Sequence, residues 1–72
     1  MSSVPSLKPR DVIKILKLHG FIELRQVGSH LHIYHPVRKL RATIPMHNKD
    51  LKKKTLLSIF RQANIRLEDI KR

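Results

Sequence analysis

Cysteine is absent from this 72-residue chain, which excludes disulfides and thiolate metal sites and gives no indication of secretion. Long apolar runs are absent too, so no segment is suited to crossing a bilayer. The first six residues also lack the basic and apolar regions of a signal peptide. These absences predict a cytoplasmic protein that does not associate with membranes.

Aromatic residues are scarce, and Phe21, Tyr34 and Phe60 are the three in the chain. Domains that read single-stranded RNA by stacking need about two or three aromatic side chains exposed on a sheet. Phe60 falls on the apolar stripe of a predicted helix, which leaves Tyr34 as the residue best placed to stack on a base. The scarcity therefore favours binding through phosphates and shape over readout of bases.

Acidic residues are few as well, because five Asp and Glu stand against 16 Lys and Arg, for a formal charge of +11. None of the five lies in residues 24–49. An excess of this size costs self-repulsion and indicates a polyanionic partner, first nucleic acid and second an acidic protein. Five dispersed carboxylates are too few for the cluster that a two-metal nuclease needs.

Hydrophobic periodicity divides the chain into two helices and three strands. The first helix is expected to begin near Pro9, which suits the first helical position, and to stop at Gly20. Apolar residues at helical spacing from Leu56 predict a second helix with Asn64 at its C-terminal end. The expected strands cover 21–27, 30–35 and 40–44, a polar loop covers 46–54, and a last helical turn covers 67–70.

This α-β-β-β-α(-α) order predicts an α+β fold, a small two-layer sandwich with both helices on one face of an antiparallel three-stranded sheet. Residues 1–7 are expected to form a flexible N-terminal arm and residues 8–72 a single domain. A domain of this size has little room for a deep internal cavity, so any chemistry is expected on an exposed face.

The segment after Gly28-Ser29 carries the most informative pattern. Gly28-Ser29 is suited to a two-residue hairpin turn with glycine at the position that needs a positive φ. The strand after it alternates apolar and polar residues, so the face opposite the core carries three polar side chains. These are His30, His32 and Tyr34. An imidazole there can act as acid or base on a ribose hydroxyl or leaving oxygen, although a solvated sheet face has the same pattern.

Metal binding by these histidines is the next alternative. His30 and His32, at i and i+2 of a strand, can share one ion, but a third ligand is required. Tyr34 is a poor ligand and no carboxylate lies nearby in the sequence, so we expect no metal and no small-molecule cofactor. His47, after the third strand, is either a loop residue that forms hydrogen bonds or a residue close enough to support the site.

Lysines precede the second helix at Lys52, Lys53 and Lys54. Positive charges oppose the helix dipole at this end and weaken the helix. A helix N-terminus with added lysines is nevertheless suited to binding phosphate, the alternative being a solvated charge run. Further candidates for RNA binding in the predicted strands and their turn are Ser29, Arg25 and Arg41.

Four motifs, in this order and spacing, resemble the HicA (YcfA-like) toxins. They are His19-Gly20-Phe21 after the first helix, Gly28-Ser29-His30 in the hairpin, Ile44-Pro45-Met46-His47 after the third strand, and Thr55-Leu56-Leu57-Ser58-Ile59-Phe60-Arg61-Gln62-Ala63 in the second helix. The resemblance covers about residues 8–70 and is far more specific than Gly-Ser-His alone. One departure is Lys54, where the family usually has glycine.

The resemblance implies a double-stranded-RNA-binding-domain-like fold and a ribosome-independent mRNA endoribonuclease that a HicB antitoxin neutralises. The small number of carboxylates and the absence of thiolates predict that its activity is metal-independent. In that family the histidine of the Gly-Ser-His motif is catalytic, which here is His30. It would serve as general base on a 2′-hydroxyl or as general acid at the leaving oxygen, and His32, Tyr34 and water remain open as the second proton-transfer group. The alternative function is a non-catalytic double-stranded-RNA-binding module.

Overall fold

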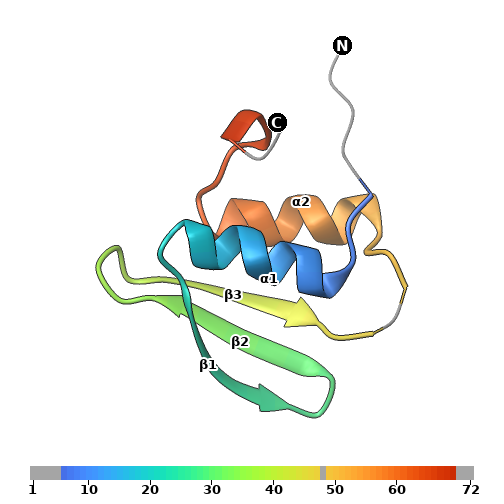
Figure 1. The fold of residues 1–72 in the computed structure, drawn as a ribbon, viewed down its shortest axis with the longest axis horizontal. Helices are drawn as coiled ribbons and strands as arrows, with labels where there is room; N and C mark the ends of the chain where they lie inside the picture. Colours follow the sequence, from blue (N-terminus) through green and yellow to red (C-terminus); the bar gives the residue numbers. More distant parts are fainter. Residues whose placement is uncertain (1–5, 48, 70–72) are drawn as a thin grey trace.

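A three-stranded antiparallel sheet with two helices on one face forms the structure, a computed structural model that describes residues 6–47 and 49–69 (Figure 1). The strands lie in the order β1-β2-β3, and both neighbouring pairs are antiparallel. The predicted α+β class and α-β-β-β-α order are confirmed. The elements are α1 (Pro9–Leu18), β1 (Ile22–Val27), β2 (His30–His35), β3 (Leu40–Pro45), α2 (Lys53–Gln62) and a 3₁₀ turn, η1 (Leu67–Asp69).

The C-terminal end of α1 is fixed by two backbone hydrogen bonds. The N–H of Phe21 donates to the carbonyl of Leu16, and the N–H of Gly20 donates to the carbonyl of Lys17, each at 3.0 Å. Gly20 has φ +95, a backbone conformation that side chains disfavour. This is the Schellman arrangement, with glycine just past the cap, and it confirms that the helix stops at Gly20.

The end of α2 repeats the arrangement with asparagine in place of glycine. The N–H of Ile65 donates to the carbonyl of Phe60 at 2.8 Å, and that of Asn64 donates to the carbonyl of Arg61 at 3.1 Å. Asn64 has φ +57, which asparagine tolerates better than most residues. The predicted role of Asn64 at this helix end is confirmed.

A substitution at Gly20 tests how tightly the connection between α1 and β1 is packed. A Cβ at Gly20 would lie 2.7 Å from Nε2 of His35. That ring cannot swing away freely, because its Nδ1 accepts the N–H of Arg38 at 3.0 Å and it packs edge-on against Phe21, with centroids 5.1 Å apart. Gly20→Ala is therefore expected to lower the free energy of unfolding by about 1–3 kcal/mol, measured by chemical denaturation.

Gly28→Ala is the matched control for this substitution. Gly28 also has positive φ, +60, but a Cβ there meets nothing within 4 Å. The control therefore retains the backbone strain without the steric contact. Equal losses of stability in the two variants would show that the contact with His35 contributes nothing.

The hydrophobic core lies between the helices and the inner face of β2 and β3. Val12 and Leu16 of α1 and Leu56, Ile59 and Phe60 of α2 are at most 2% exposed. The rest of the buried cluster comes from the inner positions of the sheet and from the connecting segments, namely Phe21, Ile33, Ala42, Ile44, Leu51, Ala63 and Ile65. The helices thus cover one face of the sheet and leave its other face uncovered (Figure 1).

The helices do not cover strand β1. All six of its residues are exposed, including Ile22 and Leu24, each with about half of its surface accessible. In the sequence Ile22 and Leu24 alternate with the charged Glu23 and Arg25, which predicts a strand with one apolar face, but in the structure that face is not buried. A register shift between Glu23 and Arg25 makes Leu24 an extra residue opposite β2, as in a β-bulge.

Of the expected N-terminal arm, residues 1–7, the structure describes only the last two residues. Residues 1–5 lie outside the described ranges, as does Ile70 of the predicted last turn. Leu7 packs against the core, and its carbonyl accepts the N–H of Leu51 at 2.8 Å. Within 6–47 and 49–69, no helix has the length and apolar character needed to cross a membrane.

Candidate nucleic-acid interface

The turn between β1 and β2 positions the first candidate residue, His30. Gly28 occupies the positive-φ position of the two-residue turn, as the sequence predicts. The carbonyl of Ser29 accepts the N–H of Met46 at 2.6 Å, which attaches the turn to the end of β3. The turn before His30 is therefore held both by the pairing of β1 with β2 and by this hydrogen bond to the end of β3.

The outward face of β2 carries the polar residues that the alternation predicts. His30 is exposed, whereas His32 and Tyr34 are half-buried, and the intervening Leu31 and Ile33 are buried on the other face. Residues that are paired across antiparallel strands share a face. His30 pairs with Val27 and Pro45, His32 with Arg25 and Thr43, and Tyr34 with Ile22 and Arg41.

Around His32, this register forms a cationic pocket of about 230 Å³, here termed the sheet-face pocket. Arg25 and Arg41, two candidate residues for RNA binding, line it from the two outer strands. Nδ1 of His32 lies 3.4 Å from Oγ1 of Thr43. The guanidinium carbon of Arg41 lies 5.6 Å from the ring centroid of Tyr34, in cation–π contact. The full lining is Leu24, Arg25, His32, Ile33, Arg41, Ala42 and Thr43.

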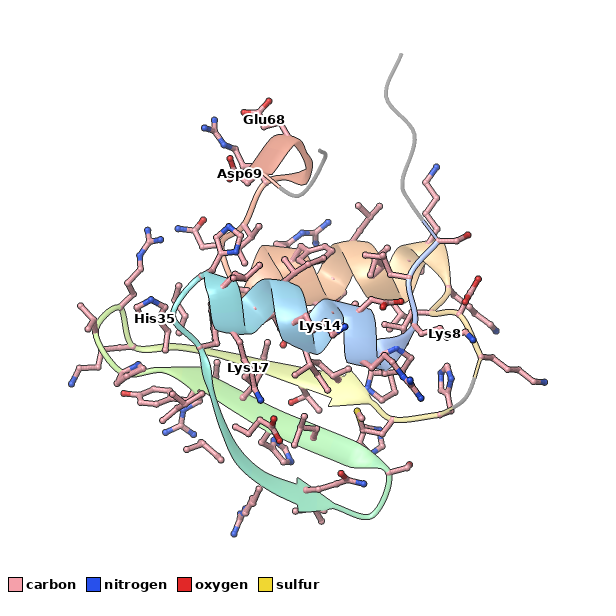
Figure 2. All side chains as sticks on the ribbon, viewed as in Figure 1. Lys8, Lys14, Lys17, His35, Glu68 and Asp69 are labelled. Carbon is pink, nitrogen blue, oxygen red and sulfur yellow. The ribbon has the colours of Figure 1, made fainter. Side chains whose placement is uncertain are left out.

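A second concentration of positive charge lies where the helices begin. Both helices start at the end of the molecule that also holds the β1–β2 turn (Figure 1). The three lysines at the start of α2 are exposed, no described side chain caps its first turn, and that turn contains no acidic residue. Lys8 lies at this end, whereas the acidic Glu68 and Asp69 lie on η1 at the far side of the molecule (Figure 2).

Lys54 takes an ordinary helical conformation there. It is the second residue of α2, and its φ is not among the positive values of the described residues. A glycine at this position is therefore not required by the backbone. The departure from the usual family pattern leaves the start of α2 intact and adds a third lysine to it.

The histidines among the predicted site residues thus lie at three separate positions rather than one. His30 lies at the start of β2, the central strand, next to the turn, and lines neither described pocket, whereas His32 belongs to the sheet-face pocket. His47 lines a different pocket together with Lys8 and Arg10. No described hydrogen bond involves the ring of His30, so its imidazole nitrogens are open to solvent and ligands in the described part of the chain.

Sequence reasoning missed two of these residues, Lys8 and Arg10. They flank Pro9 and precede His47 by more than half the length of the chain, so only the tertiary fold reveals that they share a pocket. It also missed Thr43, which pairs with His32 across β2 and β3. No three His, Asp or Glu side chains in residues 6–47 and 49–69 gather closely enough to hold a metal ion.

These features define a small, strongly basic α+β domain with a histidine-bearing sheet face and a lysine-rich end. A family model, the HicA toxin of bacterial toxin–antitoxin systems, matches residues 9–65, well over half of the chain. The chain belongs to the HicA toxin family and is the toxin component of a toxin–antitoxin system, which implies an antitoxin as its partner. No curated protein shows a significant match to the chain.

Proposed function

We propose that the toxin is a ribosome-independent mRNA endoribonuclease in which His30 is the catalytic histidine. The observation that carries the proposal is the position of His30, an exposed imidazole on a fixed turn within a strongly cationic chain. Imidazole changes its charge near neutral pH, which suits it to proton transfer. The membership in a toxin family supports an activity that damages the cell, and mRNA is a polyanion of the kind that the charge favours.

The proposed reaction is an internal phosphoryl transfer. A general base removes the proton of a ribose 2′-hydroxyl, and the 2′-oxygen attacks the adjacent phosphorus. The bond from phosphorus to the 5′-oxygen of the next nucleotide breaks, and a general acid donates a proton to that oxygen. The products are a 2′,3′-cyclic phosphate and a free 5′-hydroxyl, and His30 serves as the base or as the acid.

His32 is the second proton-transfer group that the geometry favours. It shares the outward face with His30 two residues along β2, which separates the two Cα atoms by roughly 7 Å. Two imidazoles at that separation can reach opposite sides of one phosphate. Tyr34 lies about twice as far from His30 along the strand and is in contact with Arg41. Water remains the alternative donor or acceptor.

The cationic groups near His30 would bind the phosphates of the substrate. Lys52, Lys53 and Lys54 would hold the backbone at the start of α2, where the helix dipole also favours anions. Arg25 and Arg41 would hold it from the sheet-face pocket, and Ser29 is exposed in the turn beside His30. The proposal implies a cytoplasmic location, where mRNA is translated, and a HicB-type antitoxin that neutralises the activity.

A non-catalytic double-stranded-RNA-binding module is the second candidate function. The same fold and lysines serve it equally well, since binding phosphates requires only positive charge and hydrogen-bond donors. The exposed imidazole on the fixed turn favours the enzyme, because phosphate binding alone does not require a group that titrates near neutral pH.

Cleavage of a labelled RNA oligonucleotide is expected to persist in EDTA and to depend on the 2′-hydroxyl. The rate should change between about pH 5 and 8, the range in which histidine gains or loses its charge. An oligonucleotide of the same sequence with 2′-deoxyribose at the cleaved position should remain intact there. Denaturing gels and analysis of the fragment ends measure both results.

The matched control is the all-RNA oligonucleotide of the same sequence, which the wild-type protein should cut at that position. Activity that disappears in EDTA and returns with a divalent cation would contradict the metal-independent mechanism. Cleavage at the deoxyribose position would contradict attack by the 2′-oxygen. Binding without any cleavage would favour the non-catalytic module.

A further inference from the structure

The larger of the two described pockets has no role in the chemistry assigned to the sheet face. It has a volume of about 400 Å³ and lies between the start of α1 and the segment that follows β3. Its lining consists of Lys8, Pro9, Arg10, Met46 and His47. Three of these five side chains are basic, and they come from two segments that are far apart in the sequence.

The charge of this pocket is positive and is not neutralised by its lining. Neither Lys8 nor Arg10 belongs to an ion pair in the described part of the chain, where the pairs are Lys17–Glu23 and Arg66–Glu68. The nearest carboxylate in the sequence is that of Asp11, which accepts the backbone N–H of Lys8 at 2.9 Å and is not part of the lining. The pocket is therefore suited to an anion that its side chains, rather than the helix end, would bind.

The pocket lies next to the proposed catalytic position. Pro45 pairs with His30 across β2 and β3, and the two lining residues Met46 and His47 follow directly after it. The backbone N–H of Met46 also donates to Ser29, the residue before His30. An RNA strand held with one phosphate at His30 thus has neighbouring phosphates within reach of this pocket.

We propose that this pocket binds a backbone phosphate of the RNA, next to the phosphate at which cleavage occurs. This inference rests on the proposed ribonuclease function and extends it to a second phosphate position. Lys8 and Arg10 supply the charge, and the ring of His47 donates a hydrogen bond to a phosphate oxygen. His47 is then a binding residue rather than a proton-transfer group.

The experiment measures binding of a labelled single-stranded RNA oligonucleotide as a function of salt, with every variant built on His30→Ala so that the RNA stays intact. Lys8→Ala and Arg10→Ala are each expected to weaken binding about 3- to 10-fold and to lower the slope of log K against log salt by about 0.7. Arg10→Lys keeps the charge and should retain the slope. Lys14→Ala removes one charge from the same helix outside the lining (Figure 2) and should leave the slope unchanged.

His47 is tested by its effect on each kinetic parameter in the protein that retains His30. His47→Ala should raise the KM for RNA several-fold and leave kcat nearly unchanged, because a binding residue acts on the complex and not on proton transfer. If the substitution instead lowers kcat by two orders of magnitude or more and leaves KM unchanged, this role is overturned and His47 belongs to the chemistry.

The salt experiment tests the phosphate pocket and the cleavage assay tests the ribonuclease function, so either proposal can fail without the other. A slope that Lys8→Ala and Arg10→Ala do not change, or change no more than Lys14→Ala does, would overturn the pocket while cleavage by the wild type stands. A wild type that binds RNA without cutting it would overturn the ribonuclease function, and lower slopes in the pocket variants would still support phosphate binding there. Circular dichroism of each variant confirms that it is folded.

Discussion

His30→Ala protein is expected to bind RNA and to leave it uncut. Proton transfer by a positioned side chain contributes about 10²- to 10⁴-fold to a rate, so cleavage of a labelled mRNA fragment should fall by at least two orders of magnitude. The domain should remain folded, because His30 is exposed and the removal of its ring takes away little buried surface. Expression of this variant in cells should no longer arrest growth.

His19→Gln is the matched control for the loss of one histidine. His19 follows α1, and its Nδ1 lies 2.9 Å from the carbonyl of Ile15, so the ring caps the helix away from the sheet face. Cleavage by this variant should equal that of the wild type. A folded His30→Ala protein that still cuts RNA at the wild-type rate would contradict the catalytic role and leave the non-catalytic module as the better function.

The ends of the helices and the hairpin turn could be predicted because their signals are local. Gly20 and Asn64 occupy positive-φ positions that few other residues adopt easily, and Gly28 does the same in the turn. The outward direction of His30 and His32 follows from the alternation of β2, since a strand turns successive side chains to opposite faces. None of these features depends on residues distant in the sequence.

Features that depend on packing could not be predicted in this way. The alternation of Ile22 and Leu24 predicts a strand, but whether a helix covers that strand is decided by the position of the helices, which here lie over β2 and β3. The role of His35 has the same origin. Its ring closes the corner at Gly20 by packing on Phe21, a contact between residues 14 positions apart.

The candidate site also has one part that could be predicted from local sequence and one part that depends on the tertiary fold. The lysines at the start of α2 are adjacent in the sequence and can be recognised there, whereas the pocket of Lys8, Arg10 and His47 requires the loop after β3 to meet the start of α1. The hydrogen bond between Leu51 and Leu7 fixes these two segments to one another. Charge alone could predict that phosphates bind, but only the fold shows how many separate positions the chain offers them.

Replacing Lys52, Lys53 and Lys54 by Ala is the second substitution with a large expected effect. If each lysine holds one phosphate of single-stranded RNA, the slope of log K against log salt should fall by about 2, and Kd should rise on the order of 10- to 100-fold at physiological salt. The turnover rate at saturating RNA should change little, because these lysines hold the backbone and do not move protons. Salt titrations in the His30→Ala background and cleavage kinetics in the wild-type background measure the two effects.

Stability separates this role from a defect in folding. The three lysines oppose the dipole at the start of α2, so their removal should raise the melting temperature while it weakens binding. Arg61→Ala is the matched control at the other end of the same helix, where a positive charge favours the helix. That variant should melt at a lower temperature and keep the wild-type salt slope. A triple variant that melts higher but binds with an unchanged slope would identify the lysines as a solvated charge run and transfer the binding of phosphate to Arg25 and Arg41 of the sheet-face pocket.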